Sequence, residues 1–299
     1  MLMEARAAAA QDVPEQPLIR PIDDASVLKV GEFLNRHLNS RISPDAWARA
    51  MVPTWQVDAP NHGFMLLRGG EIVGAQLAFY SERETPNGTL RLCNIAAFAV
   101  LPEFRSHSFR LLRSILKQPG YVFTDLSPSG NVPALNERLG FARLDTSCVL
   151  VPNLACLFAP NRVRLLSRDH DMAEALSGRD LRTFRDHHRA QAALQLVLVD
   201  GARRCHVIYR RDRRKNLPLF ATILHVSDED LFRAAHAQVF RHLLGRGIMF
   251  TLLEQRVADV KPPLSRRLAA NRHKMFRGSD DLPPSAIDYL YSELTCVAW

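Results

Sequence analysis

The 299-residue sequence lacks several features that would assign it to a familiar class. No apolar run approaches the roughly 20 residues that a membrane-spanning helix needs, so we expect no membrane association. No Gly-x-Ser-x-Gly elbow, Walker loop or dinucleotide fingerprint is present. The cysteines form no C-x-x-C pair, and several lie in apolar runs, which indicates buried thiols and neither a disulfide framework nor a metal site. They are Cys93, Cys148, Cys156, Cys205 and Cys296.

The histidines do not form a metal-binding pattern. Asp186-His187-His188 and His206 show no i, i+4 pairing with carboxylates of the kind that a zinc enzyme uses. His187 and His188 would face different directions on a helix. We therefore expect surface histidines and no metal.

The first residues do not resemble an export signal. Residues 1–10 are too short and too mixed in character for one. We interpret residues 1–15 as a flexible N-terminal tail, and we expect the protein in the cytoplasm.

Charge is unevenly divided along the chain. Residues 1–150 hold 15 Lys and Arg and 15 Asp and Glu, whereas residues 151–299 hold 24 and 16. Such a division indicates two domains with different surfaces. A basic second half suits a solvated surface, the phosphates of a cofactor or an acidic protein partner. The densest basic run, 210–215, lacks the interleaved aromatic residues of a base-stacking surface and is predicted to be a hairpin tip, so nucleic acid is not an expected partner.

Hydrophobic periodicity and turn residues predict a mixed α/β order in residues 16–152. The order is a strand, two helices, three antiparallel strands, a helix, a strand, a helix and a final strand. The predicted ranges are strands at 17–22, 63–68, 72–80, 90–100, 121–125 and 141–151, and helices at 23–39, from 43, at 108–117 and at 132–139. The strands at 90–100 and 121–125 are predicted to be parallel neighbours.

The second half, residues 153–299, repeats this plan faintly. A strand at 162–166 and helices around 170–191 precede a hairpin signal at 194–210. Strands at 217–226 and 249–253 are predicted to be parallel neighbours, joined by a helix from about 228 to 244. No motif is shared between the halves, so the repeat depends on the order of elements alone.

Two short motifs carry most of the functional information. The first is Arg105-Ser-His-Ser108-Phe-Arg110, which follows a buried strand and opens a helix. The second is Asn131, which begins a short helix ending at Leu139-Gly140-Phe141. Together they resemble the acyl-coenzyme A site of the GNAT superfamily of N-acyltransferases. The resemblance implies a tandem of two GNAT-like domains, 16–152 and a degenerate 153–299, each a mixed, centrally splayed sheet flanked by helices.

The resemblance also implies a set of cofactor-binding residues. In the family, the pantetheine arm pairs with the backbone of the splayed strand, and the pyrophosphate lies on amides at the following helix N-terminus. In this sequence those residues are Phe98, Ala99, Val100, Arg105, Ser106, His107, Ser108, Phe109, Arg110 and Asn131. The family pattern has a small residue at positions 108 and 110, whereas this chain has Ser108 and Arg110.

Ionisable residues that assist catalysis in relatives are missing here. The tyrosine that protonates the leaving thiolate corresponds to Asn136, and the glutamate base of some relatives corresponds to Asn94. Neither asparagine exchanges a proton near pH 7, so the catalytic residues are unknown from the sequence.

The resemblance favours an acyltransferase that moves an acetyl or longer acyl group from acyl-coenzyme A to the amine of a small molecule or a protein, without a metal. Two alternatives remain open. One is a catalytically inactive protein of this fold that binds an acyl ligand or a partner. The other is an acyltransferase whose donor is an acyl carrier protein, an acidic partner that would suit the basic second half.

Overall fold

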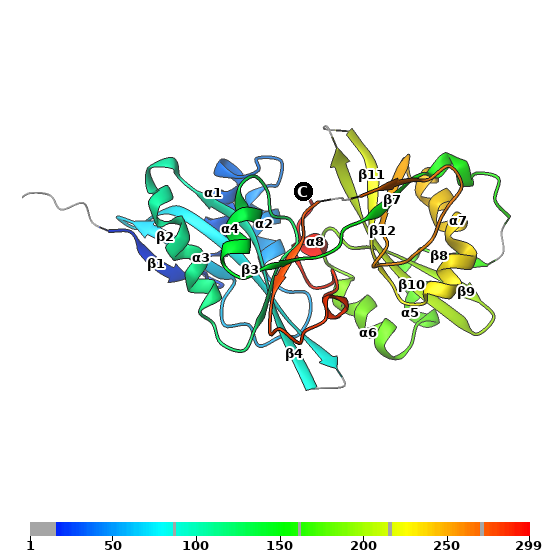
Figure 1. The fold of residues 1–299 in the computed structure, drawn as a ribbon, viewed down its shortest axis with the longest axis horizontal. Coiled ribbons are helices and arrows are strands. Elements are labelled where there is room, and N and C mark those ends of the chain that lie inside the picture. Colours follow the sequence, from blue (N-terminus) through cyan, green and yellow to red (C-terminus); the bar gives the residue numbers. More distant parts are fainter. Residues whose placement is uncertain (1–15, 86–87, 161–162, 215–216, 270–271) are drawn as a thin grey trace, which may run out of the picture.

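The computed structural model describes residues 16–299 except 86–87, 161–162, 215–216 and 270–271. The predicted tail at 1–15 and Lys215 of the predicted hairpin tip lie outside the described residues. The strands form two seven-stranded mixed sheets in two lobes (Figure 1). The strand orders are β1-β2-β3-β4-β5-β14-β6 and β13-β7-β12-β11-β10-β9-β8.

The elements of the first half follow the predicted order closely. They are β1 (Leu18–Pro21), α1 (Val27–His37), α2 (Pro44–Met51), β2 (Gly63–Arg68), β3 (Glu71–Thr85), β4 (Gly88–Val100), η1 (Pro102–His107), α3 (Ser108–Leu116), β5 (Val122–Asp125), α4 (Val132–Arg138), β6 (Ala142–Arg143) and β7 (Cys148–Pro152). The predicted start of α2 is confirmed, because the Ser43 hydroxyl accepts from the Ala46 amide and Pro44 occupies the first turn.

The elements of the second half are η2 (Asn153–Cys156), β8 (Arg164–Leu166), α5 (Asp169–Ala175), α6 (Gly178–His187), β9 (Leu194–Asp200), β10 (Arg203–Arg214), β11 (Leu217–Val226), α7 (Glu229–Gly245), β12 (Phe250–Glu254), β13 (Arg266–Leu268), β14 (Met275–Arg277), η3 (Pro284–Ala286) and α8 (Glu293–Cys296). None of the described helices is both long and apolar enough to cross a lipid bilayer.

The central splay of the first sheet lies between β4 and β5. These strands run parallel, as predicted, and pair over Leu92–Asn94 with Val122–Thr124. Beyond this point β4 continues to Val100, whereas β5 ends at Asp125. The register of β4 against β3 shifts near Ala97, whose φ of 50° is in the left-handed region that L-residues seldom adopt. The bulge turns the last residues of β4 away from β5 and opens the sheet.

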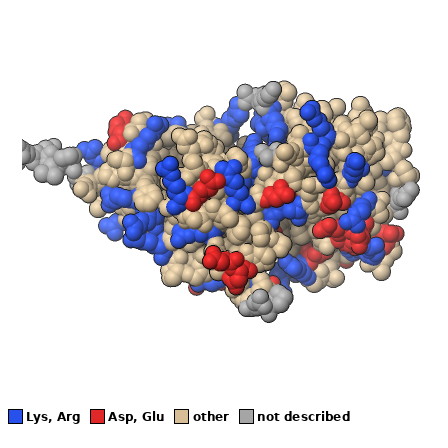
Figure 2. Space-filling view, in the orientation of Figure 1, with Lys and Arg blue, Asp and Glu red and all other residues tan. Residues whose placement is uncertain are grey.

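Basic side chains also mark the first half, although its formal charge is balanced. Figure 2 shows Lys and Arg gathered around α3 on the face in view. Arg110, Arg113 and Lys117 are exposed on this helix or directly after it.

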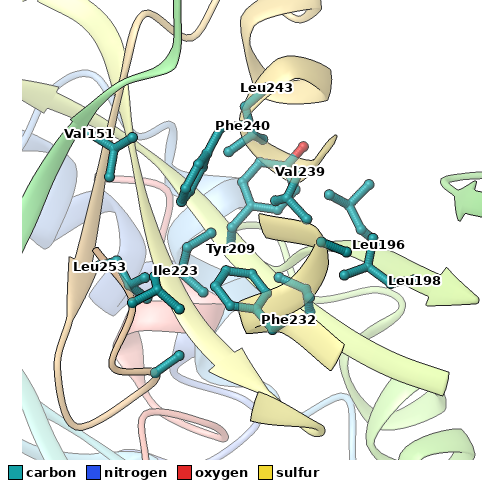
Figure 3. Packing of buried hydrophobic residues seen from close by; sticks show 14 of the residues in the cluster. Val151, Leu196, Leu198, Tyr209, Ile223, Phe232, Val239, Phe240, Leu243 and Leu253 are labelled. Atoms are coloured by element: carbon teal, nitrogen blue, oxygen red, sulfur yellow. The ribbon is translucent and has the colours of Figure 1, made fainter. Parts of the chain in front are cut away.

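The second sheet contains the predicted parallel pair. Strand β11 pairs with β12 from Phe220↔Phe250 to Ile223↔Leu253, and α7 connects the two strands. The apolar side of α7 packs on the sheet through Phe232, Val239, Phe240 and Leu243 (Figure 3). The tandem of two GNAT-like units, each with a mixed sheet flanked by helices, is therefore confirmed.

The two sheets exchange strands. We predicted one strand over 141–151, but the structure has two: β6 lies in the first sheet and β7 pairs antiparallel with β12 in the second. In return β14 enters the first sheet between β5 and β6 (Figure 1). Each sheet thus contains a strand from the other side of residue 152, and the domain division 16–152 and 153–299 stays a prediction.

A buried polar cluster joins the two sheets. Glu254 ends β12, and its carboxylate accepts from the Lys274 ammonium, just before β14, and from the Tyr289 hydroxyl. Lys274 Nζ also lies 3.9 Å from the centroid of the Tyr289 ring. Burial lowers the pKa of Lys274, and the charge of Glu254 opposes this effect.

The C-terminal segment returns to the first lobe. Helix α8 lies between the lobes in Figure 1 and contacts α2 and β4. The buried Arg210 of β10 donates to the Leu294 carbonyl at 3.0 Å and to the Val297 carbonyl at 3.4 Å. A cation at the last carbonyls of a helix is favourable, so the second sheet holds α8 against the first.

Candidate functional site

Two neighbouring cavities lie at the splay of the first sheet. The outer cleft, of about 490 Å³, is lined by His37, Leu38, Phe98, Ala99, Val100, Leu101, Pro102, Arg105 and Ser108. The inner cavity, of about 250 Å³, is lined by Leu38, Gln76, Ile95, Ala96, Ala97, Phe98, Leu112, Asp125, Ser127, Pro128, Ser129, Val132, Leu135, Asn136, Arg272 and Trp299. Leu38 and Phe98 line both.

Residues from both faces of the first sheet line the inner cavity. Trp299 packs with the apolar cluster on the α1–α2 side, whereas Leu112 and Leu135 belong to the cluster under α3 and α4. Two-substrate chemistry requires both reactants to be held together, and a cavity lined from both faces of the splay is a candidate place for this.

The structure places only part of the predicted cofactor-binding set on these cavities. Phe98, Ala99, Val100, Arg105 and Ser108 line the outer cleft. The other predicted residues, Ser106, His107, Phe109, Arg110 and Asn131, lie outside the lining of both cavities. Their role in cofactor binding stays a prediction.

The segment after β4 is helical from its start. Residues 102–107 form the 3₁₀ helix η1, which runs directly into α3, and the Ser108 amide donates to the Arg105 carbonyl. The sequence has no glycine here, and His107 and Ser108 both adopt helical φ and ψ. Arg110 Nη1 lies 3.1 Å from His107 Nδ1, so its side chain turns back toward the helix start. Because the Ser108 amide is already bonded, an anion here would depend more on side chains than the family pattern implies.

The two asparagines that the resemblance aligns with ionisable family residues each contact an acidic residue, Asn136 at the carboxylate of Asp125 and Asn94 at the backbone amide of Glu293. Asn136, fully buried in α4, donates from Nδ2 to Asp125 Oδ2 at 2.8 Å. Asp125 directly follows the last residue of β5 that pairs with β4, so its side chain lies where the strands part.

Asn94 contacts the backbone of Glu293. Its Oδ1 accepts a 2.9 Å hydrogen bond from the Glu293 backbone amide, and its Nδ2 donates to Thr124 Oγ1 at 3.2 Å. Glu293 is fully buried at the start of α8, and its Oε1 accepts from Ser127 Oγ at 2.9 Å. A glutamate from the C-terminal segment thus lies next to the asparagine that replaces the family glutamate.

Burial raises the pKa of both carboxyl groups above the usual range of exposed carboxyl groups. Desolvation raises the pKa of Asp125 to about 6, against the opposing hydrogen bonds from Asn136 and the Ser127 backbone. Desolvation and then the charge of Asp125 raise the pKa of Glu293 to about 8. Near pH 7 Asp125 is therefore mostly ionised and Glu293 mostly protonated, so the pair carries about one negative charge.

The phenols considered as proton donors lie elsewhere. The Tyr80 hydroxyl bonds Asn61 and Gln118, and the Tyr121 hydroxyl accepts from Arg91 at 2.6 Å. Neither tyrosine lines the inner cavity.

The expectation of surface histidines was wrong for two of the three. His187 and His206 are fully buried, whereas His188 is exposed. His187 Nδ1 lies 3.0 Å from the Thr183 carbonyl, and Nε2 accepts from the Tyr291 amide. Burial lowers the pKa of His187 to about 4 and that of His206 to about 3, so both are neutral structural groups. Their periodicity along a helix and a strand could have indicated this burial.

No metal centre was found among the described residues, where no group of three His, Cys, Asp or Glu side chains is placed to hold an ion. The cysteines are confirmed as buried free thiols.

The second unit has no comparable anion site at its corresponding helix. The Asp228 side chain caps α7 by accepting from the Leu231 amide and also binds Arg203. Glu229 and Asp230 add negative charge in the first turn. Carboxylates at a helix N-terminus occupy the place that a phosphate would take and repel an anion there. That the second unit is degenerate stays a prediction.

Comparisons with known proteins identify the fold. No protein-family model and no curated protein matches the sequence. Among solved structures, a GCN5-related N-acetyltransferase from Anabaena variabilis is 13% identical, with a TM-score of 0.58 over 88% of this chain and 72% of its own. A putative acetyltransferase from Pyrococcus horikoshii is 11% identical, with a TM-score of 0.58 over 94% and 96%. Eis1 from Mycobacterium abscessus is 15% identical, with a TM-score of 0.52 over 88% and 74%. This chain therefore has the fold of the GCN5-related N-acetyltransferases.

Proposed function

We propose that the protein is an acyltransferase that moves an acyl group from acyl-coenzyme A to an amine, with Asp125 as the general base. The observation that carries this proposal is the position of Asp125. Its side chain lines the inner cavity, whose lining shares Leu38 and Phe98 with the outer cleft. A base must be within reach of the proton that it removes, and a carboxylate in this lining meets that condition for an amine bound in the inner cavity next to the donor.

The outer cleft suits the pantetheine arm and phosphates of the donor. The bulge at Ala97 frees the edge of β4 at Phe98–Val100, and an extended arm can pair with free backbone groups as an added strand would. Arg105 also lines this cleft and offers a charge-assisted contact to a phosphate. When bound there, acyl-coenzyme A supplies an activated acyl group.

The residues at the splay then take part in two proton transfers. An amine that binds as an ammonium first loses one proton, which Asp125 accepts, since its raised pKa of about 6 is close to the working pH. Asn136 holds the Asp125 carboxylate in place. The free amine nitrogen then bonds to the acyl carbon, the bond between that carbon and sulfur breaks, and the nitrogen loses its second proton. The released thiolate takes up this proton through water, because no phenol lines the inner cavity within the described residues.

An acyl carrier protein remains the alternative donor, and two observations favour it. The Ser108 amide is already bonded within η1, which weakens the site for a free pyrophosphate. Exposed Arg105, Arg110, Arg113 and Lys117 lie just before α3, on it and directly after it, and such a surface attracts an acidic partner.

Turnover and calorimetry separate these possibilities. Purified protein is mixed with acetyl-coenzyme A or a longer acyl-coenzyme A and a set of primary amines, and thiol release is followed. Release that Asp125→Asn abolishes supports the proposal, with Asp200→Asn, an exposed change at the end of β9, as the matched control. Coenzyme A binding without release favours the inactive alternative. Affinity for an acylated carrier protein, but none for coenzyme A at millimolar concentration, favours the carrier-dependent enzyme.

A further inference from the structure

The inner cavity contains buried oxygen atoms that have no hydrogen-bond partner. Gln76 Oε1 and Asn136 Oδ1 are both unpartnered, although Gln76 is 3% exposed and Asn136 is fully buried. Both side chains line the cavity beside Asp125. Leaving a buried acceptor without a hydrogen bond costs free energy, so these two atoms point to a missing donor.

The missing group must be rich in donors. Asp125 is ionised near pH 7 and is then an acceptor only, as are the two amide oxygens. An ammonium group has three donors and no acceptor, and it also neutralises the charge of the carboxylate pair. A water molecule offers only two donors and leaves that charge in place.

The carbon skeleton and the far end of the ligand are also constrained. Ile95, Leu112 and Leu135 give the cavity apolar walls. Arg272 is the cationic side chain in the lining, and it is exposed at the rim. It directly precedes the segment that leads into β14, so the strand exchange brings it to this site. A guanidinium in the same lining as a cluster of acceptors matches a carboxylate on the same small molecule.

We propose that the acceptor is a compact amino acid whose primary amine binds Gln76, Asp125 and Asn136 and whose carboxylate binds Arg272. This inference rests on the acyltransferase function proposed above. The volume of about 250 Å³ admits a small skeleton and excludes large polycationic amines. The matched charges at both ends distinguish the amino acid from a simple alkylamine.

Pairs of substrates with the same carbon skeleton test this inference in the unmodified protein. Acetyl-coenzyme A is the donor, and n-propylamine is compared with β-alanine and n-butylamine with γ-aminobutyrate. We expect the KM of at least one amino acid to be about tenfold or more below that of its alkylamine, which corresponds to about 1.4 kcal/mol. Arg272→Ala should bring the ratio of the two KM values close to one, whereas Arg267→Ala, an exposed change on β13, should preserve it.

Binding provides a readout that does not require turnover. β-Alanine or γ-aminobutyrate alone should raise the melting temperature of the unmodified protein and of Arg267→Ala, but not that of Arg272→Ala. Equal KM values within both pairs, with thiol release intact, would overturn the inference and leave the proposed function in place. If no amine releases thiol, the proposed function fails, and the melting shifts then decide the amino acid site separately.

Discussion

Asn94 Oδ1 accepts a 2.9 Å hydrogen bond from the backbone amide of Glu293, a residue 199 positions away in the sequence. This contact anchors the start of α8 at the splay of the first sheet and buries the Glu293 carboxyl group beside Ser127. The C-terminal segment is thus part of the candidate site, and its carboxyl group lies near the position where the family glutamate is missing.

The outer cleft should lose coenzyme A affinity when Arg105 is shortened. Arg105→Ala removes the cation that lines the cleft, and we expect at least about a tenfold weaker Kd, in line with one charge-assisted phosphate contact. Asn131→Ala should have a smaller effect, since Asn131 lies outside both linings. Isothermal calorimetry measures these values, with Arg113→Ala, an exposed change on α3, as the control. If Arg105→Ala and Arg113→Ala weaken binding equally, the effect is one of general charge and the assignment of Arg105 is wrong.

The ion pair between the sheets should be sensitive to the loss of one partner. Lys274→Met leaves the fully buried Glu254 carboxylate without its cation, which typically costs about 3–5 kcal/mol of the free energy of unfolding. The double variant Glu254→Gln with Lys274→Met should recover most of this loss, because no buried charge remains. Urea unfolding measures both, and Lys261→Met at an exposed position serves as the control. A double variant no more stable than Lys274→Met would contradict this explanation.

Glu293 should make stability depend on pH. Its pKa is raised to about 8 in the folded state, so the folded protein binds more protons than the unfolded chain between about pH 4.5 and 8. The stability contributed by the protonated group is present below the unfolded pKa and is lost as pH rises through about 8. We therefore expect the free energy of unfolding to fall by a few kcal/mol as the pH rises from about 4.5 to about 8.

Glu293→Gln removes that proton equilibrium, and its free energy of unfolding should change less with pH than that of the unmodified protein. Urea midpoints at pH values across the window measure the difference. Glu174→Gln, at an exposed position on α5, should follow the unmodified protein. Parallel curves for Glu293→Gln and the unmodified protein would show that the carboxyl group is not protonated on folding.

Local sequence patterns predicted the elements and the two parallel strand pairs, because each pattern lies within about one element and its neighbour. The exchange of β7 and β14 was not predicted. Strands β5 and β14 pair antiparallel, for example at Phe276↔Thr124. Nothing in either short segment indicates its partner. The domain boundary predicted at residue 152 could not include this exchange for the same reason.

The candidate site was predicted only in its outer part. Phe98–Val100, Arg105 and Ser108 were found through the resemblance, and they line the outer cleft. Asp125 had a usable signal, since a carboxylate that ends a buried strand at a splayed sheet points to the site. Glu293 and Arg272 had none, because both reach the first sheet only through the returning C-terminal segment. The sequence showed that the segment before α3 lacks glycine. The structure was needed to show that this segment forms a 3₁₀ helix in which the Ser108 amide is already bonded.

The measurement that tests the central proposal most directly is the pH profile of thiol release for the unmodified protein and for Asp125→Asn. Asp125 must be ionised to accept the amine proton, so kcat should fall as pH decreases through about 6. Asp125→Asn should lower kcat by at least about 100-fold and should abolish this acid limb, because Asn cannot take up the proton. Asp200→Asn should retain both the rate and the limb. An Asp125→Asn enzyme with near-normal kcat and an unchanged profile would contradict the assignment of Asp125 as the general base.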